Sequence, residues 1–155
     1  MPSAETRLKE LQIILPTPAK PVAKYKPAVL VGNMLYVSGH GPAKVGNQVP
    51  LLGKVGSKLN LEQGMESARL VGINILSTVR NTLDSLDRVK RLVKTLGMVN
   101  ATPEFLDHPQ VINGFSELMA QVFGDDVGVG ARSAVGMGSL PGDIPVEIEC
   151  IFEVA

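Results

Sequence analysis

Arg132 stands at the head of a run of very small residues near the end of the chain, in the segment "ARSAVGMGS". If this segment is a strand, alternation places Arg132 on one face together with Ala134, Gly136 and Gly138. Small residues leave a hollow beside the guanidinium, or let another backbone approach closely. A guanidinium at such a hollow can hold a planar carboxylate through two parallel hydrogen bonds, so one interpretation is an anion-binding site.

Carboxylates alternate along the last segment, "VEIECIFEV", where Glu147, Glu149 and Glu153 share one face and mostly apolar residues share the other. From the residues alone, two interpretations of these glutamates stay open. They can form a solvated face and neutralise Arg132, or one of them can be partly buried and position or activate a water molecule. Spacing does not select which glutamate that would be.

Two other reactive residue types are read as structural. Cys150 falls on the apolar side of the last segment, so we expect it to pack in the core. As the single cysteine it can form no internal disulfide, and there is no CxxC motif or His/Cys cluster that would hold zinc, so no metal site is predicted. His40, in "SGHGP", is interpreted as a structural loop residue in preference to a catalytic base.

The composition is that of an ordinary globular domain. The chain has 155 residues, is 45% hydrophobic, and carries 15 basic and 15 acidic residues. A net charge of zero gives no basic surface of the kind that nucleic acid requires, so nucleic acid is not favoured as a partner. No apolar run approaches the length of a membrane span, and the first residues lack the pattern of a signal peptide, which predicts a cytoplasmic protein.

The first 22 residues are expected to be an extension laid against the main domain. An amphipathic helix is predicted over residues 3–13, because Ser3 can cap it and apolar residues recur at helical spacing. The proline-rich segment "LPTPAKP" then ends regular structure.

Residues 23–155 are expected to form one domain. Its predicted elements are strands at 28–31 and 34–38 joined by a tight Gly32-Asn33 hairpin, a strand near 48–52, a helix from the N-cap Asn60 to about 86, a strand at 89–99, a helix at 103–123 with Pro109 inside it, and two terminal strands. This order predicts an α+β fold, a mixed sheet with two helices on one face. The opposite face must then be solvated or buried by another chain.

Several segments, in this order along the chain, resemble the reactive-intermediate deaminase family, called RidA or YjgF and also endoribonuclease L-PSP. They are "KYKPAVLVGNMLYVSGHGP", the helix-borne "VIN" at 111–113, and the terminal "ARSAVGMGSLPGDIPVEIECIFEV". The resemblance runs from about residue 23 to the end. It implies a fold similar to that of a small bacterial chorismate mutase, and a homotrimer whose uncovered sheet faces form a central barrel, with active sites in the clefts between subunits.

The resemblance also assigns roles to residues. It implies that Arg132 grips the carboxylate of the substrate and that Glu147 orients the attacking water. Tyr25 would line the cleft, and the loop at Ser38 and Gly39 would meet the substrate. Asn113 would correspond to the helix-borne asparagine, although this chain has two more residues between Asn113 and Arg132 than the family pattern has.

Three departures from the family pattern indicate a divergent subgroup. Ala134 stands where many deaminases carry cysteine, His40 replaces a glutamine, and both the N-terminal extension and "LLGKVGSKLNLEQG" depart from the short family core.

Three functions are therefore considered. The leading one is hydrolysis of reactive enamines or imines of the 2-aminoacrylate type to 2-oxo acids and ammonia, with a small carboxylate (a 2-imino or 2-oxo acid) as ligand and no cofactor. The alternatives are a non-catalytic trimer that binds small carboxylates or regulates a partner, and an endoribonuclease. Neutral charge and 4% aromatic content give the last one no independent support.

Overall fold

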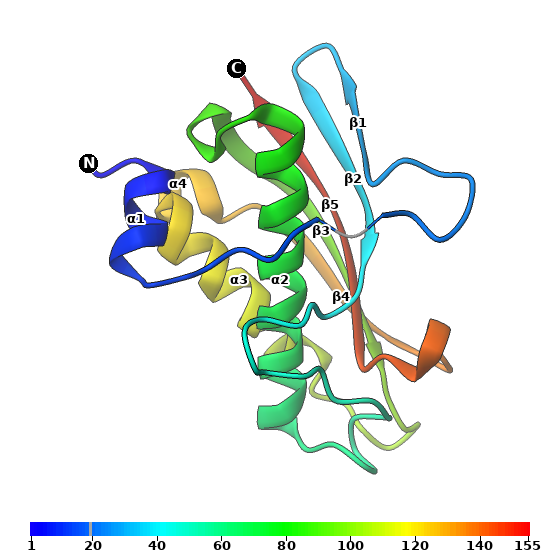
Figure 1. The fold of residues 1–155 in the computed structure, drawn as a ribbon. Helices are drawn as coiled ribbons and strands as arrows, with labels where there is room; N and C mark the ends of the chain where they lie inside the picture. Colours follow the sequence, from blue (N-terminus) through cyan, green and yellow to red (C-terminus); the bar gives the residue numbers. More distant parts are fainter. Residues whose placement is uncertain (19) are drawn as a thin grey trace.

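The computed structural model describes residues 1–18 and 20–155. Its centre is a mixed sheet (Figure 1), with the spatial order β1 (Ala28–Val31), β2 (Met34–His40), β5 (Val146–Val154), β3 (Val89–Asn100) and β4 (Ala131–Met137). Strands β3 and β4 are parallel, and the other neighbouring pairs are antiparallel. Within the described residues, no helix has both the length and the apolar character needed to span a membrane.

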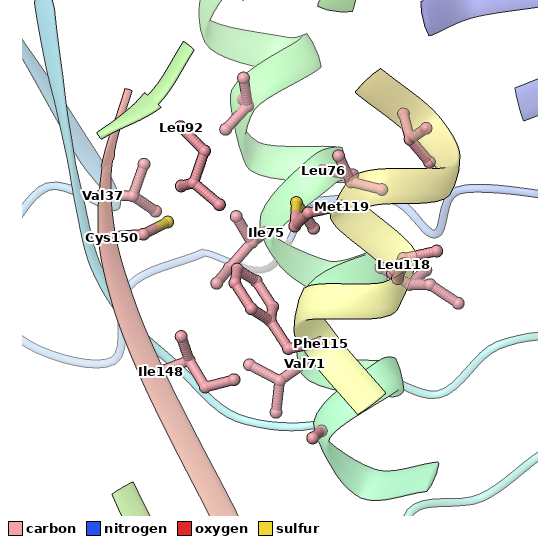
Figure 2. Packing of buried hydrophobic residues seen from close by; sticks show 14 of the residues in the cluster. Val37, Val71, Ile75, Leu76, Leu92, Phe115, Leu118, Met119, Ile148 and Cys150 are labelled. Atoms are coloured by element: carbon pink, nitrogen blue, oxygen red, sulfur yellow. The ribbon is translucent and has the colours of Figure 1, made fainter. Parts of the chain in front are cut away.

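Two long helices, α2 (Leu61–Leu83) and α3 (His108–Phe123), cover one face of the sheet (Figure 1). Helix α2 begins where predicted, because Asn60 and Gln63 each accept a hydrogen bond from the other's backbone N–H. Figure 2 shows the core between the layers, to which the strands give Val37, Leu92, Ile148 and Cys150, α2 gives Val71, Ile75 and Leu76, and α3 gives Phe115, Leu118 and Met119. The predicted α+β architecture is confirmed.

The hairpin between β1 and β2 is also as predicted. Val31 pairs with Met34 across a two-residue turn, and Gly32 takes the positive φ of 59° that such a turn demands. Strand β2 runs on to His40 and contains a bulge, because Val37 pairs with Cys150 but His40 pairs with Ile148. Ser38 and Gly39 therefore lie together opposite a single residue of β5.

Two predicted elements of the main domain differ clearly in the structure. The strand near 48–52 is wrong: this loop has one isolated bridge, between Val45 and Gln48, because Pro50 cannot donate to a ladder and Gly53 turns the backbone with φ of 122°. The helix predicted from 103 begins at His108, where Pro109 fits the first turn because its missing N–H is not needed there.

The N-terminal helix α1 (Ala4–Glu10) is shorter than the predicted 3–13, and Gln12, with φ of 56°, lies just beyond its end. Ser3 caps it as predicted, by accepting a hydrogen bond from the backbone N–H of Thr6. Helix α1 packs against α3 and the short helix η1 (Leu86–Arg88) of its own chain.

One apolar side chain of α1 anchors this contact. Leu8 is buried, whereas Leu11 and Ile14, expected on the same stripe, are exposed. Glu5 adds an ion pair with Arg80 of α2 at 2.9 Å and accepts a hydrogen bond from the backbone N–H of Leu86. Two further short helices, α4 (Asp125–Gly128) and η2 (Pro141–Asp143), were not predicted.

Candidate functional site

Arg132 reaches from edge strand β4 to helix α3. Its Nη1 donates to Asn113 Oδ1 at 2.8 Å and to Ser116 Oγ at 3.1 Å, so both N–H groups of this nitrogen are used. The guanidinium keeps Nε and Nη2, two donors on one edge, for a second partner. These three residues line a hollow of about 170 Å³ together with Thr95 and residues 128–130, and we call them the arginine half-site.

Ser116 was missed by sequence reasoning, which singled out Asn113 alone. The signal was its spacing: residues three apart on a helix share a face, so Ser116 lies beside Asn113 and below the same guanidinium.

Only part of the space beside the small residues that follow Arg132 is open. A Cβ added at Gly136 would lie 2.5 Å from His108 Nε2, so the imidazole at the start of α3 covers this glycine. The hollow beside Arg132 is therefore lined by α3 and residues 128–130, and not by the small residues Ala134, Gly136 and Gly138 as expected. At Gly138 an added Cβ would meet nothing within 4 Å.

Glu147 lies on β5 beside the bulge of β2. A Cβ added at Gly39 would overlap Glu147 Oε2, so the carboxylate occupies the space that this glycine leaves free. Burial raises the pKa of Glu147 above its ordinary value, and the nearby charge of Glu149 raises it further. A carboxylate with a raised pKa is a better base for a bound water molecule. Glu147, Gly39 and Ser38 form what we call the glutamate half-site.

The structure places Ser38 and Tyr25 close to this corner. Ser38 Oγ donates to the backbone carbonyl of Lys26 at 2.6 Å, so the hydroxyl can offer a ligand only its lone pairs. Tyr25 is 48% exposed and shares a hollow of about 170 Å³ with Gly39, walled in part by residues 20–22.

The two half-sites lie on opposite faces of the sheet. Arg132 pairs with Thr95, which pairs with Cys150, so these three side chains share the face covered by the helices. Glu147 is three residues from Cys150 on the same strand and therefore projects from the uncovered face. Within one chain the structure does not bring Arg132 and Glu147 together. Within one chain Arg132 does not neutralise Glu147, Glu149 or Glu153, as one interpretation held, because it bonds to Asn113 and Ser116 instead.

Cys150 and His40 are both buried. The pKa of the Cys150 thiol is raised far above its ordinary range, first by complete burial and then by Glu149, so its predicted place in the core is confirmed. His40 Nδ1 and Nε2 each have a hydrogen-bond partner, at Ser38 and Thr78. In the described part of the chain no three His, Cys, Asp or Glu side chains cluster closely enough to hold a metal ion.

Comparison of the sequence with known proteins identifies a family and a relative. Residues 5–143 match the family described as "YjgF/chorismate mutase-like, putative endoribonuclease". Protein TCP17 of Trypanosoma cruzi is 38% identical over 148 residues, which covers 95% of this chain and 91% of that protein.

Two solved structures show how the fold is shared. Protein Atu1372 of Agrobacterium tumefaciens superposes with a TM-score of 0.89 at 40% identity, over 98% of this chain and 92% of that one. RidA of an Antarctic Psychrobacter species gives a TM-score of 0.58 at 25% identity, over 89% and 94% of the two chains. The shape of this chain is therefore closer to Atu1372 than to that RidA.

Proposed function

Because the chain belongs to the YjgF/chorismate mutase-like family, we propose that it hydrolyses reactive 2-imino acids to 2-oxo acids and ammonia, in a cleft between two copies of the chain. The observation that carries this proposal is the pair of half-sites, one built to hold a carboxylate and the other built around a carboxylate with a raised pKa.

The arginine half-site is suited to the carboxylate of the substrate. Asn113 and Ser116 saturate Nη1 and fix the plane of the guanidinium, so Nε and Nη2 face a ligand as a pre-ordered pair of donors. A planar carboxylate accepts from both at once. Fixing the fork beforehand lowers the entropy that binding costs.

The glutamate half-site supplies the base. The C2 atom of a 2-imino acid is already electrophilic, so orientation of water is the main requirement. Glu147 takes a proton from the water whose oxygen bonds to C2 and passes it to the imino nitrogen, which gives a tetrahedral C2 carrying one hydroxyl and one amino group. The hydroxyl proton then moves to the amino nitrogen as the C2–N bond breaks, so ammonia leaves and the added oxygen becomes the carbonyl of the 2-oxo acid. Every atom comes from the substrate and one water molecule.

A second copy of the chain joins the two halves. The uncovered face of the sheet carries a hollow of about 390 Å³, lined by Tyr36, Leu96 and Ile151 among others, and Val29 and Val135 are 44% and 38% exposed. Apolar side chains on an open sheet face favour association. We propose a homotrimer in the cytoplasm, in which Glu147 of one subunit meets Arg132 of the next.

Ammonia release tests this function. An enzyme that generates 2-aminoacrylate is run with and without this protein, and ammonia is followed from the first seconds. The proposal predicts faster release with the wild-type protein and the spontaneous rate with Glu147→Gln. A spontaneous rate with the wild type, together with retained binding of 2-oxobutyrate, would instead favour the non-catalytic carboxylate binder.

A further inference from the structure

The two hydrogen bonds of His40 determine its tautomer. Nδ1 lies 2.6 Å from the carbonyl oxygen of Ser38, and Nε2 lies 2.8 Å from Thr78 Oγ1. A carbonyl oxygen can only accept, so Nδ1 carries the proton. Nε2 then has a free lone pair, which accepts from the hydroxyl of Thr78. Both nitrogens of the neutral ring are thus engaged, and neither is free to take a proton from a substrate.

The environment of the ring favours this neutral form. His40, the last residue of β2, is 9% exposed, and its partner Thr78 on helix α2 is 3% exposed. Burial lowers the pKa of His40, and the Ser38 carbonyl opposes this only in part. His40 is therefore unsuited to act as a general acid or base.

The partner of Nδ1 is the bulge itself. Every polar group of Ser38 is tethered: its N–H donates to the carbonyl of Pro27, its hydroxyl donates to the carbonyl of Lys26, and its carbonyl accepts from His40. The first two tethers lead to the segment before β1. Of these three tethers, the third leads through His40 and Thr78 to helix α2, and the next residue, Gly41, is tied to α2 separately, by Asn74 Nδ2 at 3.0 Å.

We propose that His40 is a positioning residue for the glutamate half-site. By fixing the carbonyl of Ser38 it holds the bulge in one conformation, and the bulge in turn holds Gly39 against the carboxylate of Glu147. Displacement of a reacting group by about 1 Å can cost up to about a hundredfold in rate, so a small movement of the bulge has a large effect. The inference rests on the proposed function, because the effect is expected in that reaction.

Paired variants test the inference. His40→Leu keeps bulk without a donor, whereas His40→Asn places an amide N–H near the position of Nδ1. Thr78→Val removes the hydroxyl at constant shape, whereas Thr78→Ser keeps it. We expect His40→Leu and Thr78→Val to lower kcat by about tenfold to a hundredfold, with the affinity for 2-oxobutyrate at Arg132 unchanged. His40→Asn and Thr78→Ser should recover most of the loss.

The double variant His40→Leu/Thr78→Val should lose no more than His40→Leu alone, because both changes cut one chain of contacts. Unchanged kcat in His40→Leu, or an equal loss of kcat and of anion affinity, would overturn the positioning role.

Nitrogen NMR of the imidazole provides a readout that needs no activity. The His40 signals, identified by their absence from His40→Leu, should show a neutral ring protonated at Nδ1. A ring protonated at Nε2 would overturn the inference by itself. If the wild-type protein shows the expected tautomer but releases no ammonia, the proposed function fails while the geometry of the bulge stands.

Discussion

Arg132 and Glu147 project from opposite faces of one sheet, and strand β3 lies between the strands that carry them. A small molecule bound to the guanidinium is therefore out of reach of Glu147 in the same chain. If both residues act on one substrate, they come from different subunits. The uncovered, partly apolar face that carries Glu147 is the surface on which a second subunit would lie.

Arg132→Lys should weaken binding of a monocarboxylate by about 2–3 kcal/mol, which is about thirty- to a hundredfold or slightly more. Lysine keeps the charge but lacks the planar pair of donors that Asn113 and Ser116 orient. Calorimetric titration of 2-oxobutyrate measures the change, with Arg69→Lys as the matched control. Equal affinity in wild type and Arg132→Lys would remove Arg132 from the site.

Gly39→Ala should lower kcat with little change in stability. The new methyl group meets the end of the Glu147 side chain, which can swing aside, so the carboxylate is displaced while the fold is kept. Gly138→Ala is the control, because a Cβ there meets nothing within 4 Å. Steady-state kinetics and thermal melting of both variants measure this, and a full kcat in Gly39→Ala would mean that the position of the Glu147 carboxylate does not limit the reaction.

The rate should fall as the pH is lowered through the pKa of Glu147, which burial and then Glu149 raise above the ordinary value of 4.5. The base must be ionised, so the inflection of kcat/KM lies above 4.5. Glu149→Gln removes the smaller cause and should move the inflection to lower pH. A profile that is unchanged in Glu147→Gln would contradict the assignment of this residue as the base.

The stability of the fold should fall as the pH rises, because of the ionisation of Glu147. The pKa of Glu147 is higher in the folded than in the unfolded chain, so the protonated side chain stabilises the fold. This contribution to the free energy of unfolding is fully present below pH 4.5 and is lost as the pH rises through the pKa of the folded chain. Glu147→Gln should therefore be more stable than wild type at pH 7 and similar to it at pH 4. Urea unfolding at both pH values measures this, and a lower stability of the variant at pH 7 would contradict it.

The N-terminal extension, residues 1–22, should stabilise the domain through one anchor. Leu8→Ala empties a buried position and should cost at least about 2 kcal/mol, whereas Leu11→Ala, at a side chain that is 40% exposed, should cost far less. Urea unfolding of the two variants separates them. Equal effects would mean that α1 is only a tail.

Deletion of residues 1–22 should also alter the hollow beside Tyr25, since residues 20–22 form part of its wall.

The sequence was sufficient where local chemistry decides the structure. The cap at Asn60, the Gly32-Asn33 turn and the alternation of β5 all predicted what the fold contains. It failed at the strand near 48–52, where Pro50 and Gly53 outweigh the apolar residues. The bulge at Ser38 and Gly39 depends on pairing with β5, far away in sequence, so no local pattern predicts it.

The geometry of the candidate site could not be predicted from the sequence either. Arg132 and Glu147 were selected by residue type and by family resemblance, but the face on which each lies depends on the register of three strands. Ser116 bonds to Arg132 across a separation of 16 residues, and helix spacing alone could only place it beside Asn113. Contacts of this kind follow from tertiary packing, which a single sequence does not reveal.

Mixed assemblies of two inactive variants test the central claim, that each site joins Arg132 of one subunit to Glu147 of another. Arg132→Ala and Glu147→Gln are purified separately, unfolded together, refolded as mixed oligomers and assayed for ammonia release. Each variant alone should be inactive. In the equal mixture, random pairing gives about one cleft in four an intact arginine and an intact glutamate, so about a quarter of the wild-type rate should return. A mixture that forms mixed oligomers but stays as inactive as its two components would contradict the account.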